Sequence, residues 1–218
     1  MKNNMTELVF ILDRSGSMGG LESDTIGGFN SMLAKQQEKP GGCRVTTVLF
    51  DNDYEILHDR IDLMAVSPIT EKDYFVRGTT ALLDAVGKTV NKIINVQKNT
   101  AKDSRADKVL FVITTDGLEN ASREYSCEKV KSLIERQTEK QGWEFIFLGA
   151  NIDAVEVASH IGISSKRAQN FCNDSAGVAL NYEVCACAIA DFREDGASGL
   201  SDDWGAEIEE DFAKRGSN

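Results

Sequence analysis

The stretch LVFILDRSGSMG, residues 8–19, decides the fold. Its first five residues form a continuous apolar run, which is typical of a β-strand that is buried on both faces. A polar, glycine-containing loop begins directly after this run, at Asp13. Residues 109–113 (VLFVI) and 145–148 (FIFL) repeat the apolar run further along the chain. Strands of this kind predict a parallel sheet that helices cover on both sides.

The remaining segments fit the same architecture. Residues 45–50 predict a fourth strand, residues 51–53 predict a hairpin turn, and the more polar residues 54–63 predict an antiparallel returning strand at the sheet edge. Strands alternate with helical patterns, so we predict an α/β fold: a doubly wound, mainly parallel central sheet with one antiparallel edge strand and helices on both faces. The helices are expected around Ile26, Phe29 and Leu33, around Leu82, Val86, Val90 and Ile93, around Val130, Leu133 and Ile134, and over residues 178–192.

The end of the chain differs in character from the rest. Ser175 is a suitable N-cap for the last helix, and Asp153 with Glu156 resembles a capping box before a short one. From Asp191 onward, nine acidic residues stand against three basic ones. We therefore expect one domain over residues 1–194, followed by an acidic, partly disordered tail over residues 195–218.

The composition excludes several classes of protein. The 218 residues include 35 acidic and 24 basic ones, which gives a formal net charge of −11, and such a chain repels nucleic acids. Five cysteines without even spacing argue against a secreted disulfide framework. The apolar run 8–12 is too short for a signal-peptide core, and no uncharged stretch approaches the length of a membrane span. We expect a cytoplasmic protein without a membrane partner.

Oxygen-bearing side chains follow the first strand at alternating positions. Asp13, Ser15 and Ser17 lie in a loop that also contains Gly16. Alternate residues of an extended loop can point the same way, and hard oxygen ligands suit Mg²⁺. The alternative is that these residues only form a turn and cap the following helix. The segment by itself does not decide between a metal site and a turn.

Two further segments place similar groups at element boundaries. Asp116 follows the apolar run 109–113 in the sequence TTDG, so it lies at the carboxyl end of a strand, where functional groups gather in such sheets. Thr80 lies near the start of the second helix. If the two strands are neighbours, Asp13 and Asp116 face each other across the crevice. A turn at Asp116 and helix capping by Thr80 are the alternatives.

Together the three segments resemble the von Willebrand factor type A domain with its metal-ion-dependent adhesion site. The resemblance implies that Ser15 and Ser17 ligate a metal directly, Thr80 directly or through water, and Asp13 and Asp116 directly or through held waters. It favours Thr80 over its neighbour Thr79. It further implies a bacterial-type, stand-alone intracellular member of the family that acts as a scaffold, often with ATPases or stress-response operons.

The implied function is Mg²⁺-dependent binding of a protein partner, without enzymatic activity; Mn²⁺ and Ca²⁺ are alternatives to Mg²⁺. Two carboxylates leave the ion and its ligands near neutral, and hydroxyl groups donate weakly. The ion therefore retains affinity for an Asp or Glu carboxylate from a partner. The partner's identity and the oligomeric state stay open.

Two other functions compete with this one. An aspartyl-phosphate phosphatase also carries an Asp after its first strand, but it uses a second acid two residues later, where this chain has Ser15. The second alternative is a metal-free structural domain with a vestigial motif. His58 and His160 lie outside all three segments, so we expect both to be structural or surface residues. The tail acids are a further candidate, as occupants of the open metal position.

Overall fold

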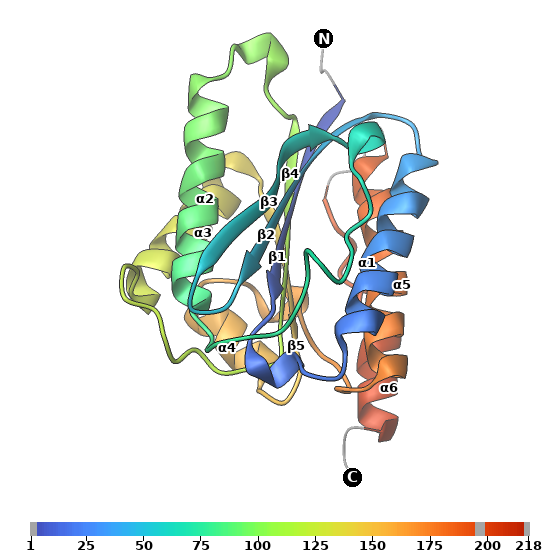
Figure 1. The fold of residues 1–218 in the computed structure, drawn as a ribbon. Helices are drawn as coiled ribbons and strands as arrows, with labels where there is room; N and C mark the ends of the chain where they lie inside the picture. Colours follow the sequence, from blue (N-terminus) through green and yellow to red (C-terminus); the bar gives the residue numbers. More distant parts are fainter. Residues whose placement is uncertain (1–3, 195–198, 216–218) are drawn as a thin grey trace.

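The computed structural model describes residues 4–194 and 199–215, which form a layered α/β structure (Figure 1). Its strands are β1 (Met5–Asp13), β2 (Gly42–Phe50), β3 (Tyr54–Asp62), β4 (Lys108–Thr115), β5 (Glu144–Gly149) and β6 (Ala168–Asn170). Within the described residues these strands form one sheet in the order β3-β2-β1-β4-β5-β6. Neighbouring strands run parallel, except that β3 runs antiparallel to β2 at the edge. The predicted fold class is confirmed, including the antiparallel edge strand.

Helices cover both faces of the sheet. They are α1 (Glu22–Gln37), α2 (Leu82–Asn99), α3 (Cys127–Gln141), α4 (Ala154–His160), α5 (Ser175–Arg193) and α6 (Ala206–Arg215). Helices α1, α5 and α6 lie on one side of the sheet, and α2, α3 and α4 lie on the other (Figure 1). The sheet therefore separates two apolar cores, as expected for a doubly wound fold.

The central strand β1 shows why the sheet is buried on both faces. Leu8, Phe10 and Leu12 point into the core beneath α1 and α5. Val9 and Ile11 point into the core beneath α2 and α3. All five side chains are buried, because side chains of a strand alternate between the two faces. The apolar run that decides the fold thus supplies both cores at once.

A glycine allows α1 and α5 to pack closely. A Cβ atom built on Gly28 in α1 would lie 2.2 Å from the ring of Tyr182 in α5, a distance that no real contact allows. Gly27 next to it has open space around the same position. The close approach of the two helices therefore depends on Gly28 and not on its neighbour.

The structure differs from the sequence expectation at three places. Strand β6 was not expected, because its three residues carry little apolar signal. Asp174, and not Ser175, caps α5: its side chain accepts a hydrogen bond from the N–H group of Gly177 at 2.8 Å. Asp153 caps α4, because its side chain accepts a hydrogen bond from the N–H group of Glu156 at 2.9 Å.

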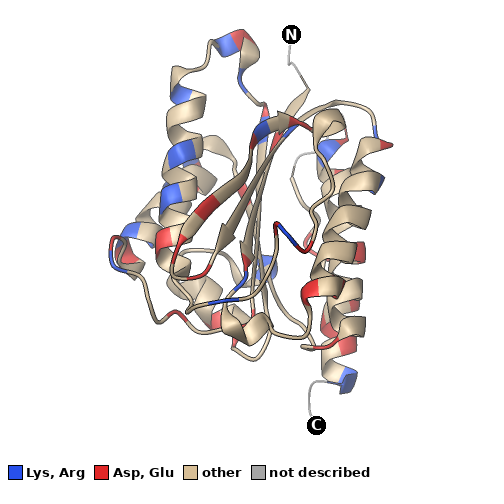
Figure 2. Ribbon diagram, in the orientation of Figure 1, with Lys and Arg blue, Asp and Glu red and all other residues tan. Residues whose placement is uncertain are grey.

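The third difference concerns the acidic tail. Residues 199–215, which fall in the segment expected to be partly disordered, contain helix α6 with Ile208 buried in the core. The remaining tail residues, 195–198 and 216–218, lie outside the described residues. Acidic side chains begin α6 and basic ones end it, which suits the dipole of the helix (Figure 2). None of the helices in the described residues combines the length and the apolar character needed to cross a membrane.

Candidate metal site

The carboxyl ends of β1 and β4 place the three candidate segments side by side. The two strands are parallel neighbours, with Leu12 opposite Thr114 in the register. Asp13 ends β1, and Asp116 follows the end of β4, so both carboxylates lie at the same edge of the sheet. The loop before α2 brings Thr80 to the same place. The structure thus brings together all five residues singled out in the sequence.

The side-chain oxygens of this cluster lie within hydrogen-bond distance of one another. The hydroxyl of Ser17 donates to Asp116 Oδ1 at 2.5 Å, and the Ser15 and Ser17 Oγ atoms are 3.1 Å apart. The hydroxyl of Thr80 donates to Ser15 Oγ at 3.0 Å. Hydroxyl and carboxylate oxygens from three loops therefore converge on one point.

Asp13 is joined to the other residues of the cluster through the backbone of Ser15. Its Oδ1 atom accepts a hydrogen bond from the N–H group of Ser15 at 2.7 Å, and its Oδ2 atom accepts one from the hydroxyl of Thr115 at 2.6 Å. Burial raises the pKa of the Asp13 carboxyl to about 6, although the hydrogen bonds from Thr115 and Ser15 act in the opposite direction. A nearby cation would offset this cost of holding a charge in a buried place.

Asp116 has an unused acceptor in the same cluster. Its Oδ2 atom is buried and has no hydrogen-bond partner among the described residues. Burial raises the pKa of the Asp116 carboxyl, while the hydrogen bond from Ser17 and, to a smaller extent, the side chain of Asn173 lower it. An unpaired buried acceptor costs free energy, and a bound cation would satisfy it.

The geometry and the donor set fit a small, hard cation. A Cβ atom on Gly117 would lie 3.0 Å from Thr80 Oγ1 and 3.1 Å from Ser17 Oγ, so glycine keeps the space beside these oxygens open. Within residues 4–194 and 199–215, no group of three or more His, Cys, Asp or Glu is placed to hold a metal. The donors here are two carboxylates and three hydroxyls, a set of hard oxygen ligands suited to Mg²⁺.

Residues that the sequence analysis missed hold the loops in place. Arg14, inside the first motif, is fully buried, and its Nε atom donates to Asp51 Oδ2 at 2.9 Å. The hydroxyl of Tyr74 donates to the backbone carbonyl of Asp13 at 2.6 Å. The side chain of Asn120 accepts a hydrogen bond from the N–H group of Thr80 at 3.0 Å. Each contact joins segments that are far apart in the chain, so no local sequence pattern predicts it.

Thr80 serves the cluster and does not cap the helix. Ala81 occupies the N-cap position of α2 and makes no side-chain bond there. The first N–H groups of α2 bond instead to Glu119 and Ser122. The capping alternative for Thr80 is therefore wrong, and its hydroxyl stays with Ser15.

The two histidines lie in other environments. His58 is buried on β3, where its Nδ1 atom lies 3.0 Å from the hydroxyl of Thr47. Burial lowers the pKa of His58, so the ring favours its neutral form. His160 ends α4 and is exposed. Neither ring contacts the oxygen cluster.

Residues 7–181 match the family model of the von Willebrand factor type A domain, so the chain belongs to this family. Proteins of the family are typically non-enzymatic protein-interaction modules. No protein among those with curated descriptions matches the sequence.

Solved structures share the fold at low sequence identity. A von Willebrand factor type A protein from Catenulispora acidiphila is 13% identical, with a TM-score of 0.58 over 87% of this chain and 43% of that one. The pilus adhesin SpaC from Lactobacillus rhamnosus GG is 12% identical, with a TM-score of 0.64 over 88% of this chain and 30% of that one. Proximal thread matrix protein 1 from the mussel byssus, solved with a zinc-occupied metal-ion-dependent adhesion site, is 16% identical, with a TM-score of 0.54 over 85% and 46%. This chain spans less than half the length of these structures.

Proposed function

We propose that the chain is a Mg²⁺-dependent protein-binding module that captures a partner's carboxylate at the cluster of Asp13, Ser15, Ser17, Thr80 and Asp116. The convergence of these oxygens from three loops, with Asp116 Oδ2 left unpaired, is the observation that carries the proposal. The metal-occupied site of the mussel protein supports it by analogy of fold.

Each residue has a role that its position suggests. Ser15, Ser17 and Thr80 would offer hydroxyl oxygens to the ion, and Asp116 its unpaired Oδ2 atom. Asp13, which already accepts two hydrogen bonds, would compensate the charge and hold coordinated water. When bound, the ion would supply a Lewis-acidic position for one more anionic oxygen. An Asp or Glu side chain of a partner has the matching charge and size.

Catalysis by Asp13 is a poorer fit to this geometry. A phosphatase of the aspartyl-phosphate type needs a carboxylate oxygen that the substrate can reach. Asp13 is 1% exposed, and its two oxygens accept hydrogen bonds from Ser15 and from Thr115. The residue is therefore arranged as an acceptor and a charge, which favours binding over group transfer.

Titration calorimetry of the full chain with Mg²⁺ tests the metal step. We expect one ion per chain, and Thr80→Ala should lower the affinity for Mg²⁺ by about tenfold or more because a ligand oxygen is lost. The matched control is Thr79→Ala, which removes the same group from the neighbouring position. Mg²⁺ uptake that is absent, or equal in the two variants, would contradict the assignment.

Selection from a library of random peptides tests the binding step. We expect the peptides retained in Mg²⁺ and released by EDTA to be enriched in Asp or Glu at the position that meets the metal. Thr80→Ala should lose this enrichment and Thr79→Ala should keep it. Peptides that are retained equally in EDTA would count against carboxylate capture by a metal.

A further inference from the structure

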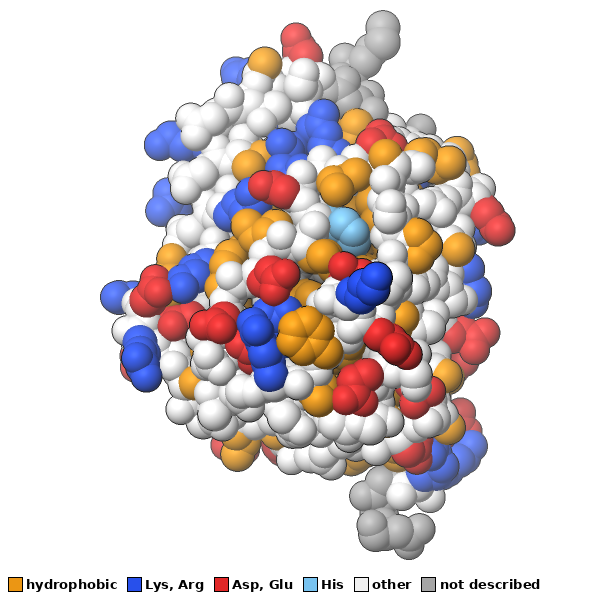
Figure 3. All heavy atoms as spheres, viewed as in Figure 1, with side chains coloured by type: hydrophobic (Ala, Val, Ile, Leu, Met, Phe, Trp, Pro, Cys, Tyr) orange, Lys and Arg blue, Asp and Glu red, His pale blue; other side chains and the backbone are white. Residues whose placement is uncertain are grey.

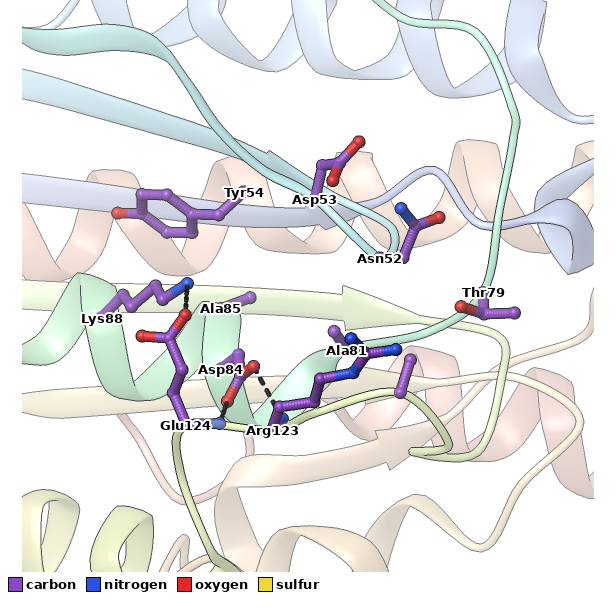
Figure 4. Close-up of a pocket in the computed structure, with 11 residues that line it drawn as sticks. Asn52, Asp53, Tyr54, Thr79, Ala81, Asp84, Ala85, Lys88, Arg123 and Glu124 are labelled. Atoms are coloured by element: carbon purple, nitrogen blue, oxygen red, sulfur yellow. Dashed lines mark hydrogen bonds and ion pairs between the residues drawn. The ribbon is translucent and has the colours of Figure 1, made fainter.

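A pocket of about 270 Å³ lies next to the oxygen cluster (Figure 4). The turn between β2 and β3 forms one wall, and the first turn of α2 with the loop 119–124 forms the other. Tyr54, Ala81 and Ala121 give it a partly apolar lining, and Arg123 extends across it toward Ala81. The oxygen cluster does not use any of these side chains.

One layer of backbone separates this pocket from the cluster. The side chain of Thr80 is buried against Ser15, whereas its two neighbours, Thr79 and Ala81, line the pocket. Side chains of an extended segment alternate in this way. Asn120 fixes the layer, because its backbone and side chain both bond to Thr80. The pocket and the cluster are therefore neighbours, on opposite sides of the segment 79–81.

The other charges around the pocket are already satisfied. The Asp84 carboxylate accepts three backbone hydrogen bonds from residues 123–125, and these bonds hold its pKa below the ordinary value against the effect of burial. Lys88 Nζ lies 2.7 Å from Glu124 Oε1. The first N–H groups of α2 are taken by Glu119 and Ser122. None of these groups offers a free positive charge to a ligand.

Arg123 is the exception. Its backbone N–H group donates to Asp84, which fixes the position of the residue. Among the described residues, no carboxylate lies within ion-pair distance of its guanidinium group. Basic and acidic side chains are interspersed over the face shown in Figure 3, and the chain as a whole carries a net charge of −11. An unpaired arginine that lines a pocket in such a protein offers a planar, two-pronged donor to an anionic group.

We propose that the Arg123 pocket binds a second acidic side chain of the same partner, beside the acid captured at the metal. The proposal rests on the proposed function and defines its ligand as a peptide segment with two carboxylates. The two positions lie on opposite sides of one backbone segment, and an extended peptide rises about 3.3 Å per residue, so two acidic side chains a few residues apart would reach both. The metal selects the first acid, and Arg123 selects the second.

The peptide selection described above also tests this inference. For the wild-type chain we expect two enriched acidic positions, a few residues apart. Arg123→Gln should lose the second preference, keep the first, and lower the affinity for a doubly acidic peptide by about three- to tenfold. Arg123→Glu should exchange the second acid for Lys or Arg. Neither substitution alters the backbone bond to Asp84.

Arg136→Gln is the matched control, because Arg136 on α3 is also exposed and has no ion-pair partner among the described residues. It removes the same charge and should keep both preferences. If the wild-type chain selects one chelator-sensitive acid but no second one, or Arg123→Gln keeps the second, this inference is overturned and the metal-binding proposal stands. If no chelator-sensitive peptides are found, the proposed function fails and this inference fails with it.

Discussion

Replacing Asp51 by Asn tests how the first motif is held in place. Asp51 directly follows β2, and its side chain is fully buried. Its Oδ2 atom accepts hydrogen bonds from Arg14 Nε at 2.9 Å and from Arg77 Nε at 2.7 Å. Asn has nearly the same shape but no charge, so the variant leaves the buried guanidinium of Arg14 without its main counter-charge. We expect a large loss of stability although only one oxygen atom is replaced, by the nitrogen of an amide group.

The structure sets the size of this loss. Removing one partner of a buried ion pair costs about 3–5 kcal/mol, because the other charge stays behind in a poorly solvated place. Arg14 Nη1 retains Glu55, at 2.7 Å, so we expect a value near the lower end, about 3 kcal/mol. With a dependence on urea of about 2 kcal/mol per molar, the midpoint of unfolding should fall by about 1.5 M.

Urea denaturation followed by circular dichroism measures this difference, with Glu55→Gln as the control. Glu55 pairs with the same arginine, but its side chain is 49% exposed, so its loss should cost less than about 1 kcal/mol. If Asp51→Asn changes the free energy of unfolding by no more than Glu55→Gln does, the counter-charge role assigned to Asp51 is wrong.

The pH dependence gives a second measure of the same interaction. Burial acts to raise the pKa of the Asp51 carboxyl, but the hydrogen bonds from Arg77 and Asp53 and the charge of Arg14 hold it below its ordinary value of 3.8. A depressed pKa stabilises the fold above 3.8, and this contribution is lost as the pH falls through the folded-state pKa. The difference between wild type and Asp51→Asn should therefore narrow in acid. A constant difference would contradict this account.

Two further predictions concern the helices on the α5 side of the sheet. Gly28→Ala should destabilise the protein by about 1–3 kcal/mol, because the new methyl group overlaps the ring of Tyr182, whereas Gly27→Ala should stabilise it by up to about 1 kcal/mol through helix propensity. Thermal unfolding of both variants measures this difference, and equal shifts of the melting temperature would contradict the packing role assigned to Gly28. Asp174→Ala should cost about 0.5–2 kcal/mol as the loss of an N-cap, and Ser175→Ala should cost less. If urea denaturation shows a larger loss of stability for Ser175→Ala than for Asp174→Ala, Ser175 is the N-cap and Asp174 is not.

Strong local patterns account for what the sequence predicts well. The apolar run 8–12 supplies both cores, so its burial can be inferred without knowing its neighbours. Short or mixed segments give weaker signals. Strand β6 has three residues, and the acidic composition of the tail conceals Trp204 and Ile208, which are buried against the body. Composition alone therefore does not indicate helix α6.

The same distinction applies to the candidate site. The motif residues follow strands or precede a helix, so their gathering at one edge of the sheet follows from the parallel topology. The supporting contacts do not follow from the topology. Arg14 donates a hydrogen bond to Asp51, and Tyr74 donates one to the backbone carbonyl of Asp13, and in both cases the partners are far apart in the sequence. The pairing of Ser175 with Asp24, where a cap was expected, is of the same kind. Such contacts depend on the packed fold and not on local spacing.

The segment that carries α6 also packs against β6, the strand at one edge of the sheet. Strand β6 is the last in the strand order, and Gly205 packs so closely on it that a Cβ atom would lie 2.6 Å from the side chain of Gln169. The indole N–H group of Trp204 donates to the carbonyl of Lys166 at 2.9 Å just before the strand. An uncovered strand edge invites pairing with another chain. We therefore expect the segment that carries α6 to hinder the pairing of another chain with β6.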